Sequence, residues 1–403
     1  MKSNPLTLAE AQRLILELAR PTPPEDIELD NAYGRIAAAP LRAALPVPSF
    51  DHSTRDGYAV KANDLRGAGA GHPIILKVTG EIAAGDTDLP RLAEGTALRI
   101  MTGAALPEGS DLVLAQEEVE RTGQTIIVSR AAPTGGHIRR KGSDLAGGET
   151  IVRAGTVLAP AHLAQLATAG IGRIKVHRRA AAAVICTGSE LVSREQPPRP
   201  GQVISGNRLL LDGLIRSAGG VTKSRATVPD RTETIAAKLA ELIGARIPLI
   251  ITTGGVGPGK FDLIREVFST LEIRTVYDSL QIRPGRATML GVLAESLIFA
   301  LPGPPPAVNL LFHELVKPAL LKSGGSRGPF HKSLQAELAE TITRMPGDLL
   351  LLKEGEYSLS RAKLLVRPAG GKAEANCILP LPPGSKQFEK GELLTIHPTA
   401  QLF

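Results

Sequence analysis

Four glycines in the second half of the chain are spaced so that backbone donors can surround an anion. Gly254, Gly255, Gly257 and Gly259 follow an apolar run over residues 248–253, where a buried strand would deliver a loop to a helix. Glycine lets peptide N–H groups approach a ligand closely, and the start of a helix favours negative charge. The pattern predicts an anion-binding loop; the simpler interpretation is a tight turn between strand and helix.

A carboxylate follows this loop directly. Asp262 falls in the first turn of a helix expected over residues 261–271, where it can contact a metal ion or a polar substrate group. It can equally be a plain N-terminal charge that the helix dipole favours.

Two cations stand nearby in the sequence. Arg283 and Arg286 flank Gly285, and guanidinium groups are natural partners of an oxyanion. The alternative is that both are solvated surface charges.

Three polar residues mark loops in the first 150 residues. Asp56 precedes Gly57, Thr102 precedes Gly103, and Asp144 ends a basic stretch that begins at Arg139. Asp-Gly is commonly only a turn, so each of these residues could be structural, and their role depends on the surrounding sequence. His52 and His137 have no metal-ligand spacing and are interpreted as polar loop residues.

The elements that must position the glycine loop alternate between strand and helix. Strands are expected over residues 180–186, 221–228, 249–253, 273–282 and 297–301, and helices over 205–218, 230–243, 261–271 and from 306 to about 322. Asp230 and Thr232 are candidate caps of the second helix. This alternation predicts a doubly wound α/β sheet, whose ligands bind beyond the carboxyl ends of the strands. Three loops fall there: 187–190 with Gly188 and Glu190, 254–262, and 302–306 with Pro302 and Gly303.

The rest of the chain divides into smaller parts. Residues 1–24 predict one amphipathic helix with a Thr7–Glu10 capping box, and residues 25–45 with 140–177 form a discontinuous, elongated domain. Short β runs separated by Gly and Pro turns predict a β-rich domain over 46–139 and a C-terminal β barrel over 325–403. The α/β domain occupies 178–324.

Composition limits the class of protein. The chain has 403 residues and a formal charge of +7, but aromatic residues make up only 3% and the cations are dispersed, which argues against nucleic-acid binding. No apolar run is long enough for a membrane helix, and the N-terminus does not read as a signal peptide. Cys186 and Cys377 lie far apart in apolar surroundings, typical of buried thiols in a reducing compartment. We expect a cytoplasmic protein.

These loops together resemble a known family. Pro48-Ser-Phe-Asp-His-Ser-Thr-Arg-Asp-Gly-Tyr-Ala-Val60 is similar to P-x-F-D-x-S-x-x-D-G-Y-A-V, a signature of molybdopterin molybdenumtransferase, the family of bacterial MoeA and the gephyrin E domain. Further blocks match at Arg99–Gly109, Ile138–Asp144, Thr187–Leu191, Asn207-Arg208, Thr253–Val256 with Asp262, and Leu301–Gly303. The resemblance covers nearly the whole chain in the right order.

The resemblance implies an L-shaped homodimer of four-domain subunits, each with a MogA/MoaB-like α/β domain, whose active site lies between that domain and the β-rich domain of the other subunit. It implies that molybdate enters adenylated molybdopterin with Mg²⁺-dependent release of AMP. Asp56, Thr102, Asp144, Glu190 and Asp262 would be catalytic, with Glu190 and Asp262 on the metal. The pterin and oxyanion would contact Gly188, Gly254, Gly255, Gly257, Arg283, Arg286, Pro302 and Gly303. Molybdopterin adenylyltransferase and recipient molybdoenzymes are the implied protein partners.

The sequence departs from the family pattern at several of these positions. Arg283-Pro-Gly-Arg-Ala287 stands where the family usually has K-P-G-K-P, so both lysines are arginines, and Pro304-Pro305 replaces the usual Asn-Pro. Ser189 replaces an aspartate of T-G-D-E-L, and the C-terminal G-x-Q-G-S-H-x-x-S stretch has no clear equivalent near residues 368–376. Three hypotheses stay open: an active molybdenum-inserting transferase, a paralogue that binds molybdopterin or finished cofactor without inserting metal, and a scaffold that retains only the dimer.

Overall fold

The N-terminal helix forms where its cap and apolar spacing place it. In the computed structural model, α1 (Leu8–Leu18) begins at the N-cap Thr7, whose hydroxyl accepts from the Glu10 N–H while the Glu10 carboxylate accepts from Thr7. Leu8, Ala11 and Ile15 are buried on one face. The predicted capping box is confirmed. The structure describes residues 4–195, 197–256, 263–330, 333–343, 347–360, 362–370, 375–384 and 386–399.

The α/β part is built on a six-stranded sheet with the order β16-β13-β17-β21-β20-β18. Its strands are β13 (Ala181–Thr187), β16 (Val221–Val228), β17 (Leu249–Thr253), β18 (Arg274–Tyr277), β20 (Met289–Leu293) and β21 (Ser296–Leu301). The first four in the order are parallel, and the predicted doubly wound arrangement is confirmed. Helices α3 (Asn207–Ser217), α4 (Thr232–Gly244) and α5 (Leu263–Thr270) cover it.

One strand prediction in this part is wrong. The extended segment expected over residues 273–282 breaks after Tyr277, because Asp278 turns the chain and pairs with Arg265 of α5. After Tyr277 only its last residue, Ile282, lies in a named strand, β19 (Ile282–Arg283), which joins another sheet. Strand β20 was not predicted, and it pairs antiparallel with both β21 and β18.

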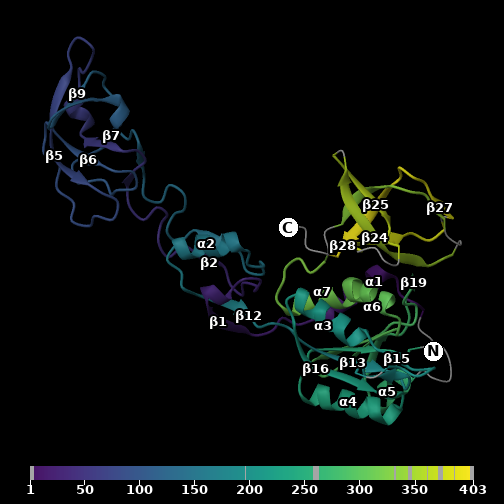
Figure 1. Ribbon diagram of the computed structural model, residues 1–403. Helices are drawn as coiled ribbons and strands as arrows, with labels where there is room; N and C mark the ends of the chain where they lie inside the picture. Colours follow the sequence, from purple (N-terminus) through teal and green to yellow (C-terminus); the bar gives the residue numbers. More distant parts are fainter. Residues whose placement is uncertain are drawn as a thin grey trace.

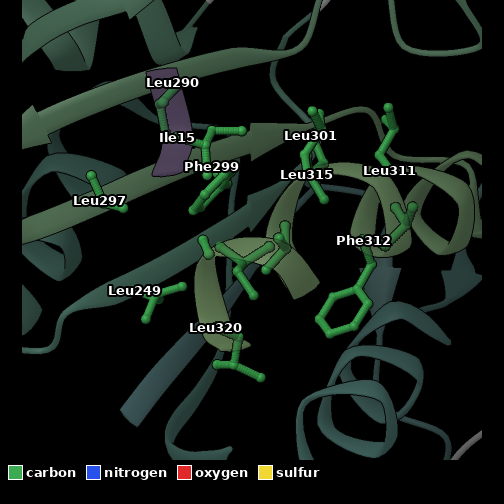
Figure 2. Packing of buried hydrophobic residues seen from close by; sticks show 14 of the residues in the cluster. Ile15, Leu249, Leu290, Leu297, Phe299, Leu301, Leu311, Phe312, Leu315 and Leu320 are labelled. Atoms are coloured by element: carbon green, nitrogen blue, oxygen red, sulfur yellow. The ribbon is translucent and has the colours of Figure 1, made fainter. Parts of the chain in front are cut away.

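Two hydrophobic cores lie on the two faces of this sheet. One contains Ile235, Leu239 and Phe268 of α4 and α5. The other gathers α1, α3 and the helical run α6 (Pro305–Leu311), the π-helical turn η4 (Phe312–Val316) and α7 (Lys317–Ser323). Figure 2 shows Ile15, Phe299 and Leu315 among the side chains that meet in this second layer. The N-terminal helix is therefore part of the α/β core.

The middle part is held by two pairs of strands that join distant segments. β1 (Pro24–Glu28) pairs with β12 (Arg173–His177), and β2 (Leu41–Arg42) pairs with β11 (Thr150–Val152), both antiparallel. Helix α2 (Pro160–Thr168) closes over a small core that includes Leu158, Leu166 and Val176.

The β-rich part emerges between these paired segments. Its six strands follow the order β7-β4-β6-β5-β9-β8, and β3 (His52–Ser53) pairs with β10 (Ile138–Arg139) beside them. The bounds are β4 (Gly57–Val60), β5 (Ile74–Ile82), β6 (Thr96–Ile100), β7 (Leu112–Ala115), β8 (Glu120–Thr122) and β9 (Thr125–Val128). In Figure 1 this sheet forms one end of an elongated molecule and the α/β part lies at the other.

The C-terminal part is a closed five-stranded barrel. Its strands are β22 (Leu334–Leu338), β24 (Leu350–Ser360), β25 (Lys363–Pro368), β26 (Cys377–Leu381) and β28 (Leu393–Pro398), and the ring closes because β24 pairs with both β25 and β26. The short strands β23 (Ile342–Thr343) and β27 (Gln387–Phe388) pair at its side. The predicted barrel is confirmed. None of the helices in the described part of the chain is long and apolar enough to cross a lipid bilayer.

Candidate active site

Three neighbouring parallel strands end side by side. Cys186 of β13 is level with Thr253 of β17, which is level with Leu301 of β21. The loops that follow these strands therefore meet at one edge of the sheet, as the alternation predicted.

The loops after β17 and β21 line a pocket of about 380 Å³ together with residues 285–287. The lining residues are 254–256, 285–287 and 302–304. They include five of the predicted ligand-binding residues: Gly254, Gly255, Arg286, Pro302 and Gly303. The volume suits a small-molecule ligand.

Glycine is required at Gly254 for two reasons. Its φ is +96°, and a Cβ atom there would lie 2.5 Å from the carbonyl oxygen of Thr187. The backbone of β17 therefore passes directly against the end of β13. Gly255 also has a positive φ, of +67°.

Asn207, the first residue of α3, ties the two pocket loops together. Its Nδ2 donates to the Gly303 carbonyl at 2.7 Å and lies 3.3 Å from Thr253 Oγ1. The side chain is buried, and among the described residues its Oδ1 has no hydrogen-bond partner. In the sequence, Asn207 stands out only as part of a motif, and this contact was not predicted.

Two carboxylates each contact the loop after β13. Gly188 is buried and its N–H donates to the Val228 carbonyl, while a Cβ at this position would lie 2.8 Å from Glu190 Oε1, so the Glu190 carboxylate folds back over it. Asp230 faces the same loop: its Oδ2 accepts from the Ser189 N–H at 3.2 Å, and its own N–H donates to Ser189 Oγ.

Asp230 was predicted only as a helix cap, and this prediction is wrong. Helix α4 has Arg231 at its N-cap and makes no side-chain cap bond. The Oδ1 atom of Asp230 is buried without a hydrogen-bond partner among the described residues. The signal that could have identified it is its place directly after β16, beside the other strand ends.

The positive charge at the pocket comes from side chains. Helix α6 starts beside the pocket with Pro304 at its N-cap, followed by Pro305 and Pro306, which have no N–H to donate. The start of this helix is therefore a poor anion site, and positive charge at the pocket comes from the exposed guanidinium of Arg286. Arg283, at the end of β19, is exposed and is not part of the pocket lining.

The β-rich part carries the remaining predicted residues. Asp56 Oδ1 accepts from both the N–H and the hydroxyl of Thr102, each at 2.7 Å. These two bonds lower the pKa of the exposed Asp56 carboxyl, so it is ionised at neutral pH.

Asp144 is a second exposed carboxylate in this part. Arg139 Nη2 lies 2.5 Å from its Oδ2, and this hydrogen bond lowers the pKa of the carboxyl. Arg139 belongs to β10, which pairs with His52 and Ser53 just before Asp56. Asp56, Thr102 and Asp144 are therefore carried by connected loops.

The fold of one chain separates the two groups of predicted residues. In Figure 1 the sheet of β6 and β7, which carries the Asp56 and Thr102 loops, lies far from β19 and α6 beside the pocket. The predicted Gly257 and Asp262 fall outside the described residues. Within the described part of the chain, no group of three or more His, Cys, Asp or Glu side chains is arranged to hold a metal ion.

Family models match two long segments of the chain. Residues 6–170 match the MoeA N-terminal region (domain I and II), and residues 183–322 match a probable molybdopterin binding domain. The second match contains all three loops at the sheet edge.

Relatives match over most of their length. "Molybdopterin molybdenumtransferase 2" of Mycobacterium tuberculosis is 32% identical over 85% of both chains, and "Molybdopterin molybdenumtransferase" of Staphylococcus aureus is 29% identical over 98% of this chain and 96% of its own. A crystal structure of the molybdopterin biosynthesis MoeA protein from Pyrococcus horikoshii has a TM-score of 0.86 and 28% identity, covering 98% of this chain and 100% of that one. The chain therefore belongs to the molybdopterin molybdenumtransferase family.

Proposed function

We propose that this protein inserts molybdate into adenylated molybdopterin and releases AMP. The observation that carries the proposal is the pocket of residues 254–256, 285–287 and 302–304, in which glycine backbone and the Arg286 guanidinium face one volume at the carboxyl edge of the sheet. A phosphate-bearing nucleotide and a tetrahedral oxyanion both need concentrated donors and positive charge, which these groups supply.

We propose Mg²⁺ as the metal that assists adenylate cleavage. Glu190 folds over Gly188 and Asp230 binds the neighbouring Ser189, and the buried Oδ1 of Asp230 lacks a partner among the described residues. Mg²⁺ binds through one or two carboxylates, several waters and the phosphates of its substrate, so a pair of carboxylates beside a phosphate pocket fits it. Asp262 is the further ligand that the sequence suggests. When bound, the ion would neutralise phosphate charge.

We propose that two copies of the chain build each site. Asp56, Thr102 and Asp144 cannot act on a ligand at Arg286 of their own chain while the β-rich part and the pocket lie at opposite ends. A second copy, related by a two-fold axis so that the β-rich part of each chain meets the α/β part of the other, would bring these side chains to the pocket. Asp56 is ionised and pre-oriented by Thr102, which suits it to bind a donor group of the substrate or a metal-bound water.

Complementation between two inactive variants tests the shared site. Asp56→Asn and Asp262→Ala should each lose most AMP release. In a mixture that exchanges subunits, half of the sites in a mixed dimer carry neither substitution, so about a quarter of wild-type activity should return at equal amounts. A strictly monomeric protein, or no recovery although mixed dimers form, would refute the shared site.

The reaction itself is tested by AMP release. Purified protein with adenylated molybdopterin and Mg²⁺ should release AMP only when molybdate is added, and chelation of Mg²⁺ should stop it. Tight pterin binding without molybdate-dependent AMP would favour the paralogue that binds without inserting metal. Failure to bind the pterin would favour a scaffold.

We propose the cytoplasm as the compartment, with molybdopterin adenylyltransferase and recipient molybdoenzymes as protein partners. Cys186 and Cys377 are free and buried, and burial raises the pKa of the Cys377 thiol to about 12. Such thiols take no part in chemistry at neutral pH and suit a reducing environment.

A further inference from the structure

The segment that carries Arg283 and Arg286 is a closed loop. The Leu280 N–H donates to the Arg286 carbonyl at 2.9 Å, and the Thr288 N–H donates to the Gly285 carbonyl at 3.0 Å. The two arginines are therefore fixed relative to strand β19, and any movement of β19 moves the pocket wall at residues 285–287.

Strand β19 is held by the C-terminal barrel. Ile282 and Arg283 pair in parallel with Leu350 and Leu351 of β24, and the Leu350 N–H donates to the Gln281 carbonyl at 3.0 Å. On its other side the segment binds the start of the chain, where the Gln281 N–H donates to the Leu6 carbonyl. Although it lies within the α/β part of the sequence, β19 belongs to the sheet of the barrel.

Strand β24 also holds the opposite wall of the pocket. Asn309 of α6 donates from Nδ2 to Glu354 Oε1 of β24 at 2.7 Å, and both side chains are half-buried. Helix α6 begins directly after residues 302–304, which line the pocket. Leu352 of β24 is buried in the same core as Leu311 of α6, so the contact is backed by packing.

We infer that strand β24 of the barrel sets the spacing between the two pocket walls, and that Glu354 and Asn309 are positioning residues for oxyanion binding. Neither lines the pocket, so neither would touch the ligand. A guanidinium fork binds an oxyanion along fixed N–H directions, so a small shift of one wall weakens binding. The inference rests on the proposed function, in which the Arg286 guanidinium binds the oxyanion at the pocket.

The pair predicts a defined kinetic signature. Glu354→Leu and Asn309→Leu should each raise the KM for molybdate, by about tenfold if the free energy of one hydrogen bond to a charged group is lost in full from oxyanion binding. The double variant should be no worse than either single one, because all three lack the same bond. Glu354→Gln keeps an acceptor for Asn309 and should stay close to wild type.

A second measurement follows the loop directly. Hydrogen–deuterium exchange of residues 280–288 in the full-length protein should be faster in Glu354→Leu and Asn309→Leu. Glu337→Leu is the matched control, because Glu337 pairs with Lys363 within the barrel, at 2.7 Å, and touches neither α6 nor β19 through that contact. It should leave both the exchange and the KM unchanged.

The outcomes separate the two proposals. If wild-type protein releases no AMP in response to molybdate, the proposed function fails, and the exchange of residues 280–288 still decides whether β24 holds the loop. If wild-type protein is active but the Glu354 and Asn309 variants change neither KM nor exchange, the inference is overturned. It is also overturned if the control variant matches them, or if the two single effects add.

Discussion

Replacement of Asn207 should distinguish a donor that ties two loops from a side chain that only fills space. Its Nδ2 binds the Gly303 carbonyl at 2.7 Å and Thr253 Oγ1 at 3.3 Å, while Oδ1 is already unpaired among the described residues. Each hydrogen bond contributes about 0.5–1.5 kcal/mol net, so Asn207→Ala should remove about 1–3 kcal/mol of the free energy that holds the two loops in place. Part of this is offset because the unpaired Oδ1 is also removed.

Asn207→Asp has nearly the same shape and should be worse. It places a carboxylate oxygen against the Gly303 carbonyl in a site where the wild-type side chain is only 6% exposed. Burial of an unpaired carboxylate is expected to cost several kcal/mol of stability. Because burial disfavours the ionised form, the pKa of the new carboxyl should be raised.

The pH dependence of the aspartate variant follows from that raised pKa. A carboxyl whose folded pKa lies above its unfolded value, about 3.9 for aspartate, contributes stability that is fully present below the unfolded pKa and is lost as pH rises through the folded pKa. The loss of stability in Asn207→Asp should therefore become smaller toward low pH, where the protonated carboxyl can donate to the Gly303 carbonyl. The Asn207→Ala defect should stay constant.

The assay is kcat/KM for AMP release together with the melting temperature of each variant. A loss of 1–2 kcal/mol in transition-state binding corresponds to a decrease of about 5- to 30-fold for Asn207→Ala. An Asn207→Asp variant whose kcat/KM and melting temperature equal or exceed those of Asn207→Ala at neutral pH would refute this explanation, since two loops that need a donor cannot prefer an acceptor.

Three further predictions follow from single contacts. Arg286→Lys should retain partial activity, because charge is the first requirement of an oxyanion and only the fork geometry is lost; a folded but inactive variant would show that the fork is essential. Thr102→Val should raise the pKa of Asp56 toward 3.8 in a carboxyl NMR titration, because the hydroxyl bond that favours the ionised form disappears; an unchanged titration would contradict this cause. Gly325→Ala should lower stability by about 1–3 kcal/mol in chemical denaturation, since φ is +87° and the new Cβ would lie 2.1 Å from a histidine ring. Gly213→Ala is its control: this exposed glycine within α3 has no atom within 4 Å of a Cβ, so alanine should stabilise by about 0.5–1 kcal/mol, and loss of stability there would show that local strain is misjudged.

The sequence alone predicts the strands and loops of the site well because their signals are local. The run before Gly254 predicts β17 with its observed bounds, and the Thr7–Glu10 pair predicts the start of α1. Parallel strands bring their ends together by geometry, so the convergence of the loops at Gly188, Gly254 and Gly303 could also be predicted.

The parts that could not be predicted depend on partners distant in sequence. Segment 273–282 has a continuous extended pattern, yet Ile282 pairs with Leu350 of the barrel. Asn207 and Asp230 look like ordinary helix-start residues until the ends of neighbouring strands are placed beside them. Local propensity contains no information about such contacts.

The nested pairing of the middle part affects how the chain folds during synthesis. β1 is made early, but its partner β12 follows about 150 residues later, so at 5–20 residues per second β1 waits about 8–30 s on the ribosome. The β-rich segment is complete well before then. Each doubling of the intervening length adds only about 0.6 kcal/mol to the entropic cost of closing the loop. The long insertion therefore delays the pairing of β1 with β12 more than it weakens it. Nascent chains halted after β9 should therefore already contain a protease-resistant β-rich segment while the region of β1 is still cleaved; equal cleavage of both would contradict this order.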